Sequence, residues 1–156
     1  MRILAVSDIH GRNDALEQVL VKHSDIRTVI FLGDGLSGVE EVADRHPDRT
    51  FLCVAGNCDH APLSPTVTVE MLGGKRFLIT HGHKYNVKYS LYTIELAARE
   101  RHADMALFGH THQPLCDYAD GLYLCNPGSL GYRGDYAIID ASDAGILVTP
   151  MSIYAR

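Results

Sequence analysis

The sequence of 156 residues predicts a mixed α/β (α+β) fold, and three observations lead to this prediction. Within the first sixty residues, apolar runs alternate with segments of helical periodicity, in the order strand, helix, strand, helix, strand. Two strand-like runs around a glycine pair then indicate a hairpin, so antiparallel strands are expected in the second half. No apolar run exceeds five residues, whereas a membrane span needs about twenty.

The first half of the chain is expected to form a parallel sheet with helical connections. Three apolar runs are predicted to be strands, and the first two of them are expected to be buried. The three runs cover residues 1–6, 28–32 and 50–54. A helix should begin at Asn13 or Asp14, with Glu17 completing a capping box, and end near His23. A second, shorter helix is expected over residues 38–45, and connections of this kind favour right-handed crossovers between parallel strands.

The second half should hold a hairpin, one helix and several short strands. Residues 66–72 and 75–80 flank the glycine pair and form the expected hairpin. Ser90 is expected to cap a helix that runs to about residue 101, because apolar residues follow it at helical spacing. The remaining strand-like runs cover residues 104–108, 122–125, 136–140 and 146–149.

Composition narrows the class of function. The formal net charge is −5, and no stretch clusters the basic side chains, so we expect no dedicated nucleic-acid binding. The four cysteines form no Cys-x-x-Cys pair, and a domain of this size is stabilised by burial, so reduced thiols are expected. Without a membrane span or a signal-peptide core, the prediction is a soluble cytoplasmic protein with no membrane attachment.

Aspartate, histidine and asparagine residues follow the ends of five apolar runs. They are Asp8, His10, Asp34, Asn57, His81, His110 and His112. Because the carboxyl ends of neighbouring strands converge on one crevice in open α/β sheets, we expect these side chains to share one pocket. Carboxylate, imidazole and amide ligands together suit divalent manganese, iron, cobalt, nickel or zinc. Seven ligands exceed the needs of one ion, which favours two ions about 3.5–4 Å apart with a shared carboxylate.

Each of these residues also has a purely structural interpretation. His10 and His112 would cap turns, and Asp34 between two glycines would be a turn residue. Asn57 would supply a left-handed backbone position after Gly56. Five independent turns would then all carry metal-competent side chains at the same end of their strands, so the shared metal pocket is the better interpretation.

Taken in order, these residues resemble the calcineurin-like metallophosphoesterase superfamily, and its small single-domain phosphodiesterase branch most of all. The motifs are Asp8-Ile9-His10, Gly33-Asp34, Gly56-Asn57-Cys58-Asp59, His81-Gly82-His83 and Gly109-His110-Thr111-His112. The resemblance extends over roughly residues 2–130 and includes Asn126-Pro127-Gly128-Ser129. It implies one domain over residues 1–156, folded as a four-layer αββα sandwich of two packed mixed β-sheets flanked by helices.

The resemblance also implies a ligand set. The first ion would be bound by Asp8, His10 and His112, and the second by Asn57, His81 and His110. Asp34 would bridge both ions, and we expect manganese, with nickel, iron, cobalt or zinc as alternatives. Two divalent ions lower the pKa of a bridging water, which would attack phosphorus as hydroxide.

One position departs from the family's pattern. The family usually has a histidine between the Asn and Asp of the third motif, where it contacts the phosphate and protonates the leaving oxygen, and this chain has Cys58. A neutral thiol brings no positive charge, which favours diesters with good leaving groups, although a passive filler role is equally open. We expect Asp59 to orient one imidazole ligand. His83 would assist leaving-group departure or be a solvated loop residue.

The predicted function is therefore hydrolysis of phosphodiester bonds in a small substrate, with two divalent metal ions as cofactors. A non-catalytic interaction scaffold with the same fold, a phosphomonoesterase and a nuclease are the alternatives. A homo-oligomer is also considered, because several tyrosines are expected on the surface. They are Tyr85, Tyr89, Tyr132 and Tyr154.

Overall fold

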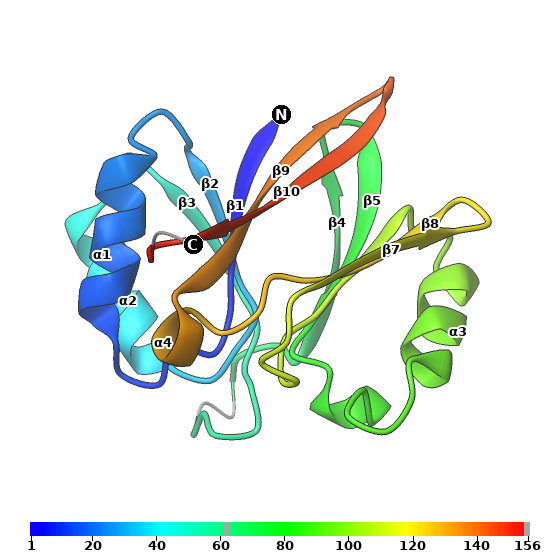
Figure 1. Cartoon of the computed structure of the whole chain (residues 1–156), viewed down its shortest axis with the longest axis horizontal. Coiled ribbons are helices and arrows are strands. Elements are labelled where there is room, and N and C mark those ends of the chain that lie inside the picture. The colour runs from blue at the N-terminus through cyan, green and yellow to red at the C-terminus, as the bar shows by residue number, and fades with distance from the viewer. Residues whose placement is uncertain (61–62, 155–156) are drawn as a thin grey trace.

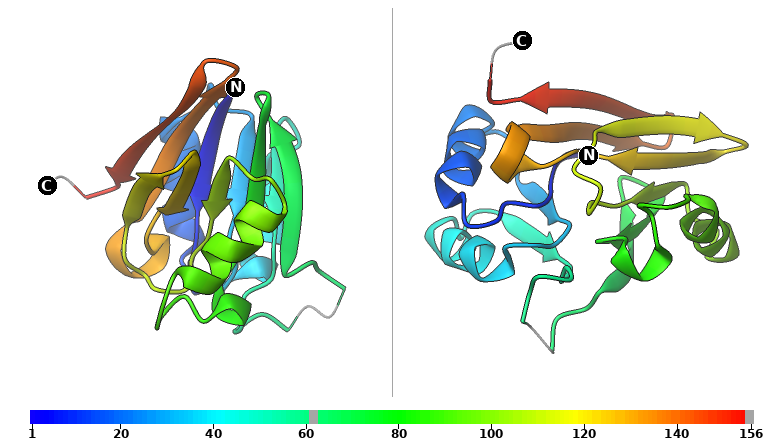
Figure 2. Two further views of the ribbon diagram at one scale, coloured as in Figure 1. Left: turned by 90° about the vertical axis from the view of Figure 1, so that its right-hand side faces the viewer. Right: turned by 60° about the horizontal axis from the view of Figure 1, so that its bottom comes forward.

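Two five-stranded mixed sheets pack face to face in the computed structural model, and helices cover their outer faces (Figures 1 and 2). The structure describes residues 1–60 and 63–154. The strand order is β10-β9-β1-β2-β3 in the first sheet and β4-β5-β6-β8-β7 in the second. The predicted sandwich of two mixed sheets flanked by helices is confirmed.

The first sheet contains the parallel strands that the apolar runs predicted. Its strands are β1 (Arg2–Val6), β2 (Thr28–Phe31), β3 (Thr50–Cys53), β9 (Asp135–Ser142) and β10 (Gly145–Ser152). β1 pairs in parallel with β2, and β2 with β3, while β9 runs antiparallel to both β1 and β10. Helices α1 (Asn13–Lys22) and α2 (Leu36–Arg45) cover the outer face of this sheet (Figure 1).

The second sheet begins with the predicted hairpin. Its strands are β4 (Val67–Leu72), β5 (Lys75–Thr80), β6 (Met105–Leu107), β7 (Leu115–Ala119) and β8 (Leu122–Asn126). The β4–β5 turn needs Gly73 and Gly74, since both have left-handed backbone angles, with φ of +58° and +79°. Helix α3 (Tyr92–Glu100) covers the outer face, where its Ile94 packs with Leu78 and Ala106.

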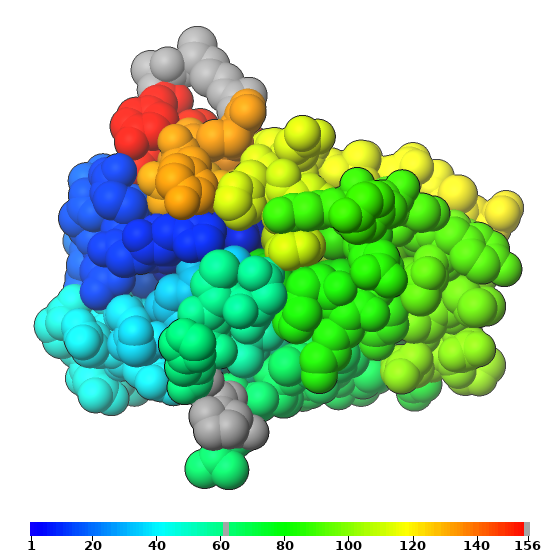
Figure 3. Space-filling model, turned by 90° about the horizontal axis from the view of Figure 1, so that it is seen from below, coloured from blue at the N-terminus to red at the C-terminus, as the bar shows by residue number. Residues whose placement is uncertain are grey.

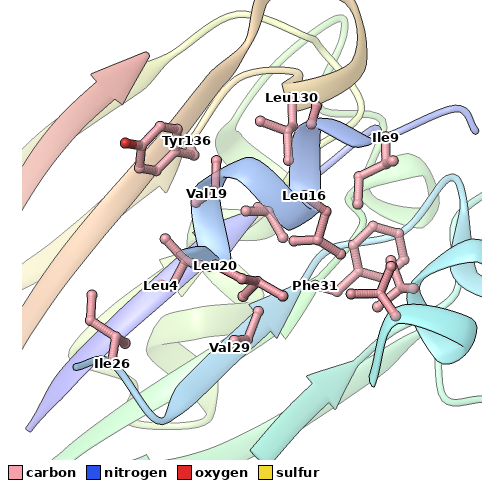
Figure 4. Close-up of a cluster of buried hydrophobic side chains, with 14 of the residues drawn as sticks. Leu4, Ile9, Leu16, Val19, Leu20, Ile26, Val29, Phe31, Leu130 and Tyr136 are labelled. Atoms are coloured by element: carbon pink, nitrogen blue, oxygen red, sulfur yellow. The ribbon is translucent and has the colours of Figure 1, made fainter. Parts of the chain in front are cut away.

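Both faces of β1 are buried, which explains why its sequence lacks the alternation of a half-exposed strand. Leu4 and Val6 face α1 and α2, in a cluster that includes Leu16 and Val19 of α1 (Figure 4). Ile3 and Ala5 face the second sheet, in a separate cluster between the two sheets. Burial on both faces makes this strand a rigid base for the loop that follows it.

The structure corrects two sequence predictions about helix N-termini and contains three short elements that the sequence did not predict. The N-cap of α1 is Arg12, without a side-chain capping bond. Glu17 instead accepts a hydrogen bond from Arg45 of α2, and its Oε2 lies 2.7 Å from Nε2 of His46, the residue after α2. Helix α3 begins after Leu91, although Ser90 Oγ still accepts a hydrogen bond from the Tyr92 N–H. Strand β7, helix α4 (Leu130–Arg133) and the 3-10 turn η1 (His83–Tyr85) were not predicted.

Within residues 1–60 and 63–154, no helix combines the length and the apolar character needed to cross a membrane.

The packing of α1 gives a matched test of the core. Val19 is 0% exposed and Val21 is 73% exposed on the same helix. Val19→Ala should lower the free energy of unfolding by about 2 kcal/mol, because it removes buried methyl groups and leaves a cavity. Val21→Ala should change it by less than about 0.5 kcal/mol. Urea unfolding measures both, and equal effects of the two substitutions would contradict this packing.

Candidate metal centre

The seven predicted ligands lie at one end of the two sheets, each just beyond a strand. Asp8 and Asp34 follow the parallel strands β1 and β2, and Asn57 lies beyond β3. His81 directly follows β5, and the loop after β6 carries His110 and His112. Figure 3 views the molecule from this end and shows segments from distant parts of the chain side by side. The sheet topology therefore brings the predicted ligands to a common edge, as expected.

The first cluster consists of Asp8, His10 and His112. His112 Nε2 lies 3.1 Å from Asp8 Oδ1, and His10 Nε2 lies 3.4 Å from His112 Nε2. Asp8 Oδ2 accepts hydrogen bonds from Ser7 Oγ and from the His110 N–H, whereas the buried Oδ1 has no hydrogen-bond partner among the described residues. A buried carboxylate oxygen without a donor is costly unless a cation approaches it.

The second cluster surrounds His81. Its Nε2 lies 3.0 Å from Asn57 Oδ1, 3.1 Å from His110 Nδ1 and 3.4 Å from Asp34 Oδ2. The Nδ1 of His81 lies 2.6 Å from the Leu32 carbonyl, which only accepts, so Nδ1 carries the hydrogen. In a neutral imidazole the Nε2 lone pair then faces the Asn57 oxygen, an arrangement that needs a proton or a metal ion between them.

Asp34 lies between the two clusters. Its Oδ2 is 3.4 Å from His81 Nε2 in one cluster and 4.0 Å from His10 Nε2 in the other. Its Oδ1 accepts a hydrogen bond from the Cys58 N–H. Burial would raise the pKa of Asp34, but the neighbouring His81 imidazole and the hydrogen bond from the Cys58 N–H outweigh it and hold the pKa well below its usual range. The carboxylate is therefore ionised and placed to serve both clusters.

These donor sets fit divalent cations. Atoms bound to one ion at about 2.0–2.2 Å lie about 3–3.5 Å apart from each other. The contacts of His81 Nε2 with Asn57, His110 and Asp34 fall within this range, as does the contact between His10 and His112. The carboxylate, imidazole and amide atoms are also the ligand types that borderline divalent metals accept.

Most of the predicted ligands have strained backbone conformations. Residues other than glycine rarely adopt positive φ, although Asp, Asn and His do so more often than other types. Left-handed angles between +47° and +69° occur at Asp8, His10, Asp34, His110 and His112. Such strain is typical of functional sites, where the surrounding structure holds a conformation that costs free energy.

Asp59 fixes the loops that carry Asp34 and Asn57. Its two oxygens accept four backbone hydrogen bonds of 2.8–2.9 Å, two to each oxygen. The donors are the N–H groups of Asp34, Gly35, Leu36 and Gly56. Burial would raise the pKa of Asp59, but these donors lower it overall. We expected this carboxylate to orient an imidazole; among the described residues its hydrogen bonds go to backbone instead.

The tight approach of these loops requires glycine at position 33. Gly33 has φ of +96°, and a Cβ atom there would lie 2.6 Å from the Gly56 nitrogen and 2.8 Å from His81 Nδ1. A larger residue would push apart the strand ends that hold Asp34 and His81. The Gly-Asp sequence is therefore a packing requirement as well as a ligand motif.

Cys58 and His83 both lie beside the clusters. Cys58 Sγ and the ligand atoms of His10 and Asp34 lie within 4.8 Å of one another. Partial burial and the neighbouring Asp34 raise the pKa of the Cys58 thiol, so it is neutral near pH 7. The His83 ring centroid is 5.4 Å from that of His81. The Nδ1 of His83 is buried without a hydrogen-bond partner among the described residues.

Three residues support the metal centre through contacts that the sequence analysis did not predict. The Asn126 side-chain amide donates to the Gly109 carbonyl and to Thr111 Oγ1, which holds the loop of His110 and His112. Ser129 Oγ donates to the Asp8 carbonyl and caps α4. Tyr132 lies against His10 and His112, with ring centroids 4.9 and 5.2 Å away. The Asn-Pro-Gly-Ser sequence predicts a turn at this segment. The contacts of Asn126, Ser129 and Tyr132 with the metal-centre loops are visible only in the folded structure.

The fold and the paired Asp and His clusters define the metallophosphoesterase class of protein. The calcineurin-like phosphoesterase superfamily domain matches residues 1–144, so the chain belongs to this family. The family resemblance of the five motifs is thereby confirmed.

Two relatives of similar sequence have names that refer to phosphoester hydrolysis. The chain is 32% identical to the probable metallophosphoesterase YsnB of Bacillus subtilis (strain 168), over 83% of this chain and 75% of that protein. Phosphodiesterase YfcE of Escherichia coli (strain K12) is 27% identical, over 90% of this chain and 88% of that protein.

Solved structures share the fold. A Streptococcus pneumoniae TIGR4 protein, described as a predicted phosphoesterase, has a TM-score of 0.83 at 24% identity, covering 97% of this chain and 88% of that one. Entamoeba histolytica Vps29 complexed with Zn²⁺ has a TM-score of 0.73 at 18% identity, covering 99% and 100%. At these identities the likeness concerns the fold alone.

Metal binding should stabilise the folded protein, because the clusters exist only in the folded chain. Adding Mn²⁺ to chelator-treated protein should raise the melting temperature, with about 2.7 kcal/mol gained at a hundredfold excess over the dissociation constant. Asp34→Asn should remove most of this shift, and Asp44→Asn on the exposed side of α2 should retain it. Thermal unfolding by circular dichroism measures the shift, and an equal shift in the Asp34 variant would contradict the shared-ligand role.

Asp59→Asn tests the hydrogen bonds from four backbone N–H groups to Asp59 and leaves every predicted metal ligand unchanged. The amide has a single acceptor oxygen, so some of the four N–H groups lose their partner, at a cost of about 2–3 kcal/mol in the metal-free protein. Urea unfolding in chelator measures this, with Asp44→Asn as the control. A loss below about 0.5 kcal/mol would show that the anchor is dispensable.

Proposed function

We propose that this phosphoesterase-family protein is a metal-dependent phosphodiesterase with two divalent cations at the candidate metal centre. The observation that carries the proposal is the position of Asp34 between two donor clusters. Divalent cations held there supply positive charge for the phosphoryl oxygens and activate water as a nucleophile. We propose manganese as the metal, since the mixed oxygen and nitrogen donors suit it.

The chain's own residues organise the site for this chemistry. His81 keeps its hydrogen on Nδ1 by donating to the Leu32 carbonyl, which leaves Nε2 free to bind. Asp34 Oδ1 accepts a hydrogen bond from the Cys58 N–H, which fixes the position of its charge. Because these groups are oriented before substrate binds, little reorganisation is needed during the reaction.

A diester is the substrate class that the donor set favours. The neutral Cys58 thiol lies near His10 and Asp34, where it adds no positive charge for the second anionic oxygen of a monoester. A diester carries one negative charge and, with an aryl leaving group, needs no strong acid. We propose that His83, whose ring lies beside that of His81, contacts the leaving group.

The surroundings of the site support a small substrate. A pocket of about 470 Å³ adjoins the loop of His110 and His112. It is lined by Val87, Lys88, Leu91, Phe108, Thr111, Gln113, Pro114 and Leu115. We propose that its apolar side chains receive an organic group of the diester. We also propose a cytoplasmic location, which the four free cysteines support.

A scaffold without catalysis is the second candidate, because one relative at 28% identity is named for vacuolar protein sorting and not for hydrolysis. Bound metal alone does not separate the candidates, since Entamoeba histolytica Vps29 also binds Zn²⁺, but the phosphodiesterase requires metal. A phosphodiesterase should retain two metal ions per chain after purification in the presence of manganese, because all seven ligand positions are filled. Elemental analysis after gel filtration measures this ratio, and a chain that retains no metal would favour the scaffold.

Asp34→Asn should abolish diesterase activity. Loss of the central anion should reduce the turnover of bis(p-nitrophenyl) phosphate at least about a hundredfold, as for other electrostatic groups in active sites. Release of p-nitrophenol with and without chelator gives the readout, and Asp44→Asn should match the native protein. Undiminished turnover in chelator, or in the Asp34 variant, would overturn the proposed mechanism.

Cys58→His tests the substrate preference. An imidazole at this position brings a donor that can carry positive charge near the phosphate, so monoesterase activity should rise relative to diesterase activity. The ratio of rates on p-nitrophenyl phosphate and bis(p-nitrophenyl) phosphate measures the change. Cys58→Ser is the control and should keep the native ratio. An unchanged ratio in the histidine variant would favour the passive filler interpretation of Cys58.

A further inference from the structure

Two cysteines outside the metal centre lie directly opposite each other in the second sheet. Strands β7 and β8 form an antiparallel hairpin, with β7 at the edge of the sheet (Figures 1 and 2). Cys116 on β7 pairs in register with Cys125 on β8. Cα atoms of directly opposed residues in antiparallel strands lie about 4.5–5.5 Å apart, which is within the range of about 4.4–6.8 Å that disulfides span.

The side chains of this pair share one face of the sheet. Two positions along the hairpin, Tyr118 and Tyr123 are also directly opposed, and their rings contact with centroids 4.5 Å apart. Because side chains alternate along a strand, Cys116 and Cys125 project to the same side as these tyrosines. Cys125 and Tyr123 both belong to the cluster between the two sheets. The two thiols are therefore neighbours.

The two thiols differ in access to solvent. Cys116 is exposed at the sheet edge, and Cys125 is 1% exposed. A hydrogen bond from the Cys125 thiol lowers the pKa of Cys116 to about 7, while the same contact and burial raise the pKa of Cys125. Cys116 is thus the accessible nucleophile, and Cys125 is a protected thiol beside it. The other cysteines, Cys53 and Cys58, have raised pKa values.

We propose that Cys116 and Cys125 are a modification site, at which the two side chains form a reversible disulfide with each other and a low-molecular-weight disulfide such as oxidised glutathione is the oxidant. The Cys116 thiolate attacks one sulfur of the small disulfide, forms a mixed disulfide and releases one thiol. Cys125 then gives up its proton and attacks the Cys116 sulfur, which releases the second thiol. Two protein thiols are oxidised and one small disulfide is reduced to two thiols.

The bond would fasten the edge strand beside the metal centre. β7 begins shortly after His112, and Cys125 directly precedes Asn126, whose amide holds the Gly109 carbonyl and Thr111. The disulfide therefore links the segment that follows the His110 loop to the segment that supports it. Its formation requires only the two thiols and the small disulfide, so it does not depend on the proposed function.

Peptide mapping of the full-length protein tests the proposal. The protein is incubated with oxidised glutathione, and free thiols are blocked with N-ethylmaleimide before digestion without reductant. Trypsin leaves both cysteines in one peptide, since residues 102–132 contain neither Lys nor Arg. That peptide should be lighter than the reduced peptide by two hydrogen atoms and should carry no label. After reduction with dithiothreitol and a second treatment with N-ethylmaleimide, it should carry two labels. A protease that cleaves before Asp117 and Asp120 should yield two linked peptides.

Substitutions separate the attacking role of Cys116 from the resolving role of Cys125. Cys125→Ser should keep glutathione on Cys116 as a stable mixed disulfide, because the resolving thiol is missing. Cys116→Ser should leave Cys125 unmodified, and Cys58→Ser should form the native bond as the matched control. Persistent glutathione on Cys116 of the native protein, with Cys125 labelled by N-ethylmaleimide, would overturn the proposal. So would a native protein in which both thiols are still labelled after incubation with excess oxidised glutathione.

Discussion

The structure depends on a concentration of electron-rich side chains at one end of two packed sheets. Two aspartates, four histidines and an asparagine meet there, with Asp34 between the clusters and a buried oxygen of Asp8 without a donor among the described residues. Such a group is unfavourable without positive charge. The family membership and the donor geometry point to the same resolution, which is the binding of divalent cations.

The rest of the fold holds this arrangement in place. The β1 strand is buried on both faces, so the left-handed turn at Asp8 starts from a rigid support. Asp59 ties the Asp34 loop to Gly56 through four backbone hydrogen bonds, and Asn126 ties the loop of His110. Local strain at the ligands is therefore compensated by contacts that involve no ligand side chain.

The sequence predicts those features of the fold and site that depend on local sequence, and it misses those that depend on contacts between distant segments. Strands buried on both faces are visible in the sequence as apolar runs, and the residues after them were identifiable because topology brings strand ends together. Strand β7 was missed because four of its five residues are exposed and show no alternation. The role of Asp59, the contact of Tyr132 with His10 and the pairing of Cys116 with Cys125 depend on contacts between distant segments or on strand register, which local sequence does not specify.

The central claim is that the two clusters bind separate cations that share Asp34. Anomalous X-ray diffraction from crystals grown with Mn²⁺ tests it most directly. The account predicts two anomalous peaks about 3.5–4 Å apart, one beside Asp8, His10 and His112 and one beside Asn57, His81 and His110. A single peak, or peaks away from Asp34 in well-ordered crystals grown with excess metal, would contradict it.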